Sequence, residues 1–289
     1  DPEMSMHLWM YEGITEYFAQ HFQVQQGLVT NAEFYNTIVG KITASKSYDD
    51  SLSFTKMSQN ILEEPYASNY GNVYAKGALI AMCLDILIRE KSNRERSLLS
   101  VMKELTDRYG PNRPFEDQAI IPQITEMTYP AIGEFFEKHV IGTIPINYSA
   151  FFDKVGLEYN TLRVPTQYFL DLETRTPYID ASQADNTIFV RPGIELHSFF
   201  NEIGLQGGDV IKAVNGTEYD VSNIYDLITQ SIAWKEGDAI SFTIERDGQE
   251  MVLTGKTNTP IINKATITEL QYFTEGPELR LRQSWLKGS

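Results

Sequence analysis

The feature that most constrains the fold is a change of hydrophobic period near Val164. Before this point, apolar residues recur every three or four positions, which is the spacing of amphipathic helices. After it, apolar and polar residues alternate, which is typical of strands with one buried face. We therefore expect an α+β chain. An all-α helical bundle (residues 1–160) should be followed by a small β-rich domain (161–258) and by a C-terminal tail (259–289) that packs back on the bundle.

Helix boundaries in the first part are marked by capping residues. Gly27 should end the first helix, and Thr30–Glu33 forms a capping-box pattern that should begin a helix running to about Ala44. Ser97 and Pro130 suit the first positions of later helices. Residues 45–72 are polar and should form a loop with a short helical turn. The residues expected to face the core are Met10, Ile14, Tyr17, Phe18 and Phe22 in the first helix and Leu98, Leu99, Met102 and Leu105 in the helix after Ser97.

The β-rich part carries strand and turn signals. Strands are expected over Tyr168–Ile179 and Thr187–Arg191, and Asp209–Gly216 should be a strand that ends in an Asn-Gly turn. A helix should follow from Ser222 to about residue 232. The alternating segments on either side of Asp247–Gly248 predict a β-hairpin.

Charge and composition exclude several classes of function. The formal net charge of −15 opposes binding to nucleic acid or to anionic membrane surfaces. No run of eighteen apolar residues predicts a transmembrane segment. Cys83 is the only cysteine, which excludes an intrachain disulfide and a cysteine-rich metal site. The compartment stays open, with the periplasm or cell envelope of a bacterium favoured over the cytoplasm.

Glu12 is the most informative single residue. It lies between Trp9 and Tyr17, and a carboxylate among aromatic side chains is costly to desolvate unless a cation meets it. We therefore expect a positive group beside it. The simpler interpretation is a surface glutamate on the solvent side of the helix, paired with nothing.

The residues around Glu12 also resemble a known family. The pattern Trp9-x-x-Glu12-Gly13-Ile14-Thr15-x-Tyr17-Phe18 looks like the third-ligand segment of the gluzincin zinc peptidases, and it is most similar to the glycyl aminopeptidases. This resemblance implies the C-terminal half of a thermolysin-like catalytic domain. It also implies a Zn²⁺ cofactor held by Glu12 and by two histidines of an H-E-x-x-H helix, with one position open for water.

No H-E-x-x-H motif occurs in this chain. The four histidines are His7, His21, His139 and His197, and none has a histidine partner four residues away. Because the motif precedes the glutamate in the family, we expect this chain to be a C-terminal fragment of a longer enzyme. Such a fragment should fold without metal, lack tightly bound zinc and show no measurable peptidase activity.

A second segment carries the same resemblance. Tyr74-x-Lys76-Gly77, leading into an apolar helix, is similar to the segment that supplies a catalytic tyrosine in the glycyl aminopeptidases and the aminopeptidase N family. The resemblance makes Tyr74 a hydrogen-bond donor to the oxyanion of a tetrahedral intermediate. Tyr70 is a possible second donor, and Glu16 a possible supporting residue near the metal ligand. A lone tyrosine before a helix is otherwise more often a packing residue, and Lys76 should serve the fold.

The β-rich part resembles a bacterial PDZ domain. Ile203–Ile211, followed by Val214–Gly216 and Arg246–Gly248, matches its glycine and Asn-Gly signature. PDZ domains bind extended peptides along a sheet edge. The usual glycine-rich loop for a peptide carboxylate is not evident, and Phe199–Phe200 could fill the groove, so a supporting role is an equal alternative. His197 is expected at the surface.

The sequence leaves two alternative functions. In the first, the chain is part of a zinc-dependent aminopeptidase that hydrolyses peptide bonds by metal-activated water, with peptides as substrates and as possible ligands of the PDZ groove. In the second, it is a non-catalytic PDZ-containing peptide-binding protein derived from a peptidase. A complete enzyme using another chemistry has no support from a nucleophile cluster or phosphate-binding loop.

Overall fold

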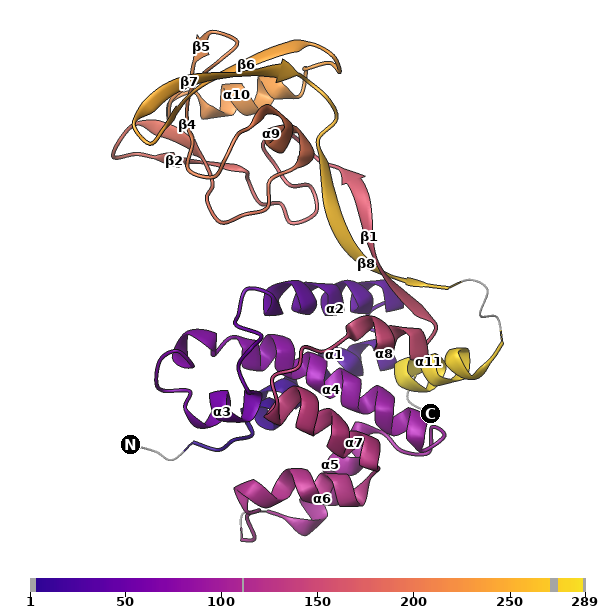
Figure 1. Ribbon diagram of the computed structural model, residues 1–289. Helices are drawn as coiled ribbons and strands as arrows, with labels where there is room; N and C mark the ends of the chain where they lie inside the picture. Colours follow the sequence, from indigo (N-terminus) through magenta and orange to yellow (C-terminus); the bar gives the residue numbers. More distant parts are fainter. Residues whose placement is uncertain (1–3, 111, 271–274, 288–289) are drawn as a thin grey trace. The chain divides into compact units, whose positions relative to one another are not determined.

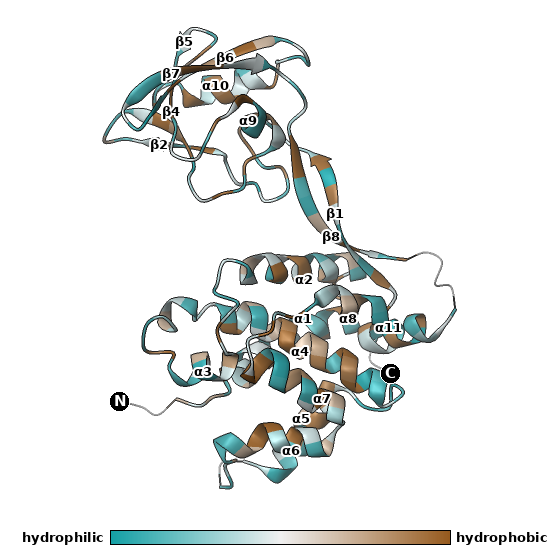
Figure 2. Ribbon diagram, in the orientation of Figure 1, coloured by the Kyte–Doolittle hydropathy of each residue, from teal (hydrophilic) through white to brown (hydrophobic). Residues whose placement is uncertain are grey.

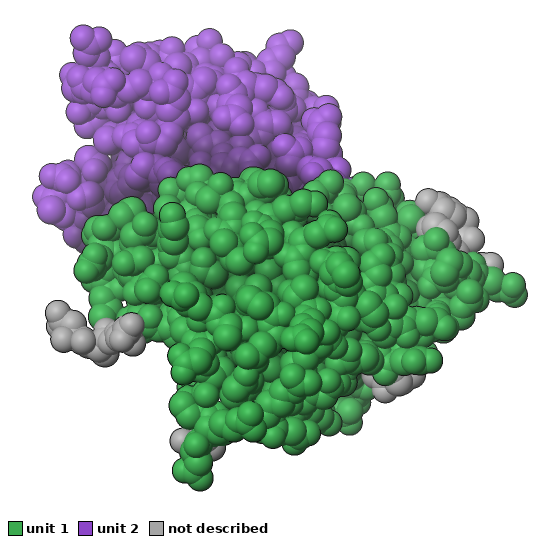
Figure 3. Space-filling view, turned by 60° about the horizontal axis from the view of Figure 1, so that its bottom comes forward, with its two compact units in different colours: residues 1–160, 265–289 green, residues 161–264 purple. Residues whose placement is uncertain are grey.

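The chain forms two compact units, shown in different colours in Figure 3. The computed structural model describes residues 4–110, 112–270 and 275–287. Unit 1 comprises residues 1–160 and 265–289, and unit 2 comprises residues 161–264. The chain leaves unit 1 through strand β1 (Leu157–Pro165) and returns through β8 (Ile261–Glu269), and these two strands pair with each other (Figure 1). The expected α+β class is confirmed.

Unit 1 is built around helix α4 (Asn72–Lys91). Almost every residue from Asn72 to Arg89 is buried, so this helix is packed on all sides, and its hydrophobic residues are brown in Figure 2. A helix buried on all its faces lies in the core of its unit, and the buried polar residues of α4 therefore need partners there. The other helical segments of the unit are η1 (Trp9–Gly13), α1 (Ile14–Gln25), α2 (Asn31–Ser45), α3 (Phe54–Gln59), η2 (Ala67–Asn69), α5 (Leu98–Arg108), η3 (Asp117–Ala119), α6 (Ile120–Met127), α7 (Pro130–Phe136), η4 (Glu137–Ile141), α8 (Tyr148–Lys154) and α11 (Pro277–Lys287).

The capping predictions are confirmed. Thr30 and Glu33 form a reciprocal capping box at the start of α2, and Ser97 caps α5. Pro130 is the first residue of α7. Gly27 follows the end of α1 with a φ of 68°, a left-handed conformation that glycine adopts without steric cost.

Two expected core residues are exposed. Phe22 is 59% exposed and Leu99 is 45% exposed. The buried positions of α1 are Ile14, Tyr17, His21 and Val24, so a polar histidine occupies the stripe where Phe22 was expected. His21 can be buried there because its Nε2 atom lies 2.6 Å from the carbonyl oxygen of Trp285, a partner that the local pattern does not reveal.

The first helical segment has an unexpected geometry. Residues Trp9–Gly13 form a π-helical turn, wider than an α-helix, before α1 begins at Ile14. Glu12 lies in this turn. Single π-turns are often found at functional sites.

Unit 2 is a six-stranded antiparallel sheet with two helices. The strand order is β2-β3-β4-β6-β7, with β5 beside β4. Both expected turns are confirmed, since Asn215-Gly216 and Asp247-Gly248 have positive φ at both positions, as a type I′ turn requires. The elements are β2 (Ile179–Ser182), β3 (Thr187–Val190), α9 (Ser198–Ile203), β4 (Val210–Val214), β5 (Thr217–Glu218), α10 (Ile224–Ser231), β6 (Ala239–Arg246) and β7 (Gln249–Lys256).

One strand expected in the second part is absent from the described residues, and two observed strands were not predicted. Tyr168–Ile179 is not a continuous strand, because Asp171 accepts hydrogen bonds from the backbone of Glu173 and Thr174 and turns the chain; only an isolated bridge joins Leu170 to Pro177. Strands β1 and β8 were not anticipated. Their pairing joins segments about a hundred residues apart and leaves β1 exposed or half-buried along most of its length, so no alternation marks it.

Three residues of unit 2 are buried, although the sequence suggested a peptide groove for Phe199 and Phe200 and the surface for His197. Phe199 and Phe200, on α9, are fully buried in the hydrophobic core of the unit. His197 is 1% exposed, so the expectation of a surface residue was wrong. Its Nδ1 atom accepts a hydrogen bond from the backbone of Phe200 and caps α9, while Nε2 lies 2.8 Å from the carbonyl oxygen of Tyr168.

The C-terminal helix belongs to unit 1. Helix α11 packs against α1, α4 and α8, and Trp285 is fully buried. Among the described residues, no helix combines the length and the apolar character needed to cross a membrane.

Candidate active site

Two glycines allow η1 and α4 to cross at very short range. A Cβ atom added to Gly13 would lie 2.5 Å from the carbonyl carbon of Gly77, and one added to Gly77 would lie 3.0 Å from the Cα of Gly13. Neither position can hold a side chain unless the backbones separate. Glu12 directly precedes the first glycine, and Tyr74 lies about one helical turn before the second, so the crossing brings both side chains to one place.

Tyr74 is in direct contact with Tyr70 and lies near the carboxylate of Glu12. Its hydroxyl lies 3.0 Å from the hydroxyl of Tyr70, and the two rings meet edge to face with centroids 5.7 Å apart. The hydrogen bond with Tyr70 raises the pKa of Tyr74 well above its usual value, as do partial burial and the nearby negative charge of Glu12. The Tyr74 phenol is therefore protonated at neutral pH and can donate a hydrogen bond.

Glu12 has no cationic partner in the part of the chain described here. It is half-buried, and no lysine, arginine or histidine among those residues forms an ion pair with it. The expected positive group is thus not supplied by these residues. The negative charge of Glu12 contributes to the raised pKa of Tyr74, so the two side chains lie near each other.

The other two candidates near this site have partners of their own. The Oε1 atom of Glu16 accepts hydrogen bonds from Lys41 at 2.8 Å and from Gln20 at 2.7 Å, which ties α1 to α2. Lys76 is buried and forms an ion pair with Asp50. Its ammonium group also lies 5.8 Å from the centre of the Phe54 ring. Glu16 and Lys76 therefore hold the scaffold together, and the suggested supporting role of Glu16 toward the metal ligand stays a prediction.

The described residues do not form a complete metal site. They contain no cluster of three or more histidine, cysteine, aspartate or glutamate side chains that could hold an ion. The imidazole of His7 lies 2.6 Å from the carbonyl oxygen of Asp117 and accepts a hydrogen bond from Trp9. By its position and lack of an ion pair, Glu12 could supply one carboxylate ligand.

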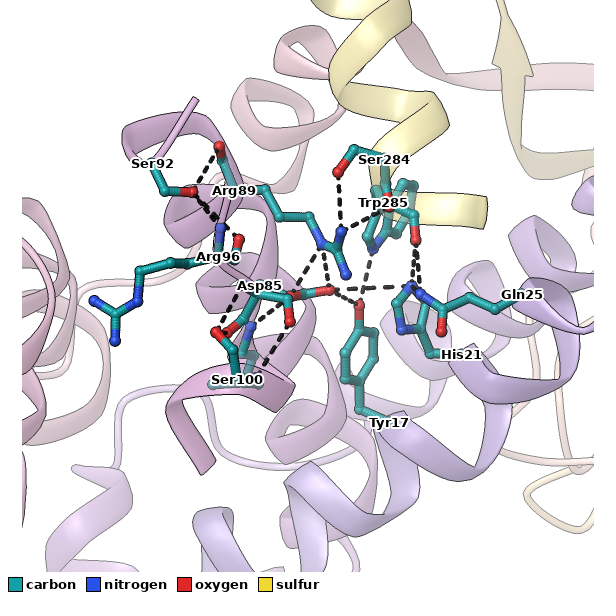
Figure 4. A network of polar contacts seen from close by, with 12 residues as sticks. Tyr17, His21, Gln25, Asp85, Arg89, Ser92, Arg96, Ser100, Ser284 and Trp285 are labelled. Atoms are coloured by element: carbon teal, nitrogen blue, oxygen red, sulfur yellow. Dashed lines mark hydrogen bonds and ion pairs between the residues drawn. The ribbon is translucent and has the colours of Figure 1, made fainter. Parts of the chain in front are cut away.

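Unit 1 contains a buried polar network that the sequence did not predict (Figure 4). The Tyr17 hydroxyl donates to Asp85 and accepts from the indole of Trp285, each at 2.8 Å. Arg89 donates from Nε to both oxygens of Asp85 and from Nη1 to the carbonyl oxygen of Ser284 at 2.6 Å. The sequence feature that could have indicated this network is the spacing of Asp85 and Arg89, four residues apart in a largely apolar helix.

The network fixes protonation states in the core. Burial, followed by the charge of Asp85, raises the pKa of Tyr17. Burial also lowers the pKa of His21. Both side chains are neutral near pH 7, so the charge in this network is the Asp85–Arg89 pair. The network joins α1, α4 and α11, so hydrogen bonds hold the last helix of unit 1 in place.

Comparisons with known proteins agree with the resemblance. Residues 1–80 match the family model of the M61 glycyl aminopeptidases. The structure is also similar to an aminopeptidase N family protein from Idiomarina loihiensis, with a TM-score of 0.61 and 19% identity. That alignment covers 98% of this chain and 49% of the other, so the chain spans about half the length of this relative. The resemblance expected from Glu12 and Tyr74 is confirmed for this part of the chain.

Two further solved structures match a smaller share of the chain. Both are PDZ domains of EpsC from Vibrio cholerae. One is 29% identical over 27% of this chain and 75% of its own, with a TM-score of 0.22. The other is 30% identical over 28% of this chain and 94% of its own, with a TM-score of 0.21. No curated protein sequence matches.

Proposed function

We propose that this chain is the C-terminal part of a zinc-dependent aminopeptidase. In this proposal Glu12 is one ligand of the metal, and a segment outside this chain supplies the two histidines and the general base. The observation that carries the proposal is the crossing of Gly13 and Gly77, which brings Glu12 beside Tyr74 within the segment that matches the glycyl aminopeptidase family.

The roles follow from the chemistry of each group. When bound, a zinc ion would lower the pKa of a water molecule and polarise a peptide carbonyl. Tyr74 would donate its proton in a hydrogen bond to the oxyanion that forms as the carbonyl is attacked, and its raised pKa keeps that proton in place. Tyr70 orients the Tyr74 hydroxyl through the contact at 3.0 Å.

The test uses the full-length protein and an aminoacyl p-nitroanilide with a small residue. Tyr74→Phe should lower kcat by about 100-fold or more with little change in KM, as expected when a hydrogen bond made mainly in the transition state is lost. Tyr11→Phe is the matched control, because Tyr11 lies next to Glu12 in the sequence and is 72% exposed. Equal activity of the Tyr74→Phe variant and the wild type would reject the catalytic role.

A second function is supported by one observation in unit 2. Strand β2 lies at an edge of the sheet and, within the described residues, pairs with β3 alone, so its other side can accept an added strand. A peptide-binding protein that uses this edge would bind extended peptides without hydrolysing them. Isothermal titration of the chain with a library of short peptides distinguishes the two functions, since only this second one requires a ligand whose affinity is lost when β2 is altered by Ala181→Pro.

A further inference from the structure

Unit 1 has a cavity that contains none of the proposed active-site residues. Its volume is about 640 Å³, and Glu12, Tyr70 and Tyr74 do not line it. This volume is typical of small-molecule sites, which range over roughly 300–1,000 Å³. The lining comes from α1, from the end of α4, from residues 94–97 between α4 and α5, and from the start of α5.

One side of the cavity is apolar. Phe18 and Phe22 contribute aromatic rings from α1, and Leu99 contributes an aliphatic side chain from α5. Phe22 and Leu99 are among the large hydrophobic residues that remain exposed in this structure. These are the same two residues that the sequence placed in the core, so their exposure is concentrated where the cavity opens.

The rest of the lining is largely polar, and most of its groups are already paired. Asp85 accepts hydrogen bonds from Tyr17, from Arg89 and from the backbone of Leu98, so its oxygens are occupied (Figure 4). Arg96 donates to the carbonyl oxygen of Met127 and to Glu104, each at 2.6 Å. These two groups therefore already have hydrogen-bond partners within the protein.

Two charged groups of the lining, Arg94 and Glu95, form no ion pair and no side-chain hydrogen bond within the described ranges. Glu95 is exposed, whereas Arg94 is half-buried. For Arg94, a second feature stands out. Its backbone has a φ of 75°, a left-handed conformation that is costly for a long side chain and that glycine or asparagine usually occupies. Strain of this kind persists where another requirement holds the residue in place.

We propose that this cavity binds a small organic carboxylate that carries an apolar group, with the carboxylate on Arg94 and the apolar group against Phe18, Phe22 and Leu99. A planar guanidinium matches a carboxylate through two parallel hydrogen bonds. Glu95 also lines the cavity, but its side chain is exposed to water, and the high dielectric constant there reduces its repulsion of an anion. Inorganic phosphate, which has no apolar part, would leave these three apolar side chains without a contact.

The test is calorimetric titration of the purified chain with two probes of the same shape. N-acetyl-L-phenylalanine carries the carboxylate, and N-acetyl-L-phenylalaninamide replaces it with a neutral amide. The wild type should bind the acid at least ten times more tightly than the amide. Phe22→Ser, which removes the ring at the mouth of the cavity, should weaken binding of the acid several-fold.

The informative variant is Arg94→Gly. Glycine relieves the left-handed backbone, so the melting temperature should stay the same or rise, while affinity for the acid should fall at least tenfold. Arg108→Gln is the matched control, because Arg108 is exposed on α5 and does not line the cavity. Three results would overturn the proposal: no detectable binding of the acid at millimolar concentration, equal binding of acid and amide, or unchanged affinity in Arg94→Gly.

Discussion

Gly13 and Gly77 are packed so closely that a Cβ atom on the first would lie 2.5 Å from the carbonyl carbon of the second. This relationship holds the π-helical turn that carries Glu12 against the helix that carries Tyr74. Gly13 and Gly77, one from each sequence motif, are therefore required to bring Glu12 close to Tyr74.

The crossing predicts a specific loss of stability. Gly13→Ala should lower the free energy of unfolding by about 2 kcal/mol or more, because backbone atoms rather than a flexible side chain must move. Gly40→Ala is the matched control, since Gly40 lies in α2 with nothing within 4 Å of its added Cβ, and there alanine should stabilise the helix by up to about 1 kcal/mol. Urea unfolding of both variants measures the difference. Similar free energies for the two variants would show that the crossing is not tight.

The buried network makes a second prediction. Asp85→Ala should cost about 3–5 kcal/mol, since Arg89 would keep its charge in the core without its carboxylate partner. Glu134→Ala removes an ion pair with Lys138 that is solvent-exposed on both sides, and it should cost less than about 1 kcal/mol. Thermal unfolding of the two variants tests the contrast, and a small loss for Asp85→Ala would mean that the network contributes little.

His197 predicts a pH dependence in unit 2. Burial lowers the pKa of His197 to about 4, against about 6.5 in the unfolded chain. The folded state thus binds fewer protons between these values. Its stability is fully present above pH 6.5 and is lost as the pH falls toward 4, by a total of about 3 kcal/mol.

This dependence is measured by urea unfolding from pH 4 to pH 8, followed by NMR signals from unit 2. His197→Gln should be less stable than the wild type at pH 7, because the cap of α9 and the contact with Tyr168 are altered. Its stability should also change less over the same pH range. A variant with the wild-type slope would assign the pH dependence to another group.

The sequence predicted the local features of the fold better than the distant ones. Capping boxes and Asn-Gly or Asp-Gly turns act within a few residues, so the boundaries of α2, α5 and the β6–β7 hairpin were predicted from their own residues. The pairing of β1 with β8 joins distant segments and has no local signal.

The core was harder to predict where polar groups are buried. The hydrophobic pattern assigns Phe22 to the interior and gives no reason to bury His21, whereas His21 is buried beside Asp85 and Trp285 and Phe22 is exposed. For the candidate site, Glu12, Tyr70 and Tyr74 were named from a resemblance, and the structure brings them together. The glycine crossing that does so depends on an approach between two helices, which periodicity does not encode.

Zinc content is the most direct measure of the central claim. The full-length protein, purified without added metal and analysed by mass spectrometry, should contain about one zinc ion per chain. Glu12→Gln, which keeps the shape of the side chain and removes its charge, should lose most of that zinc while keeping its fold, and Glu16→Gln should retain it. Zinc bound equally well by the wild type and by Glu12→Gln would contradict the assignment of Glu12 as a metal ligand.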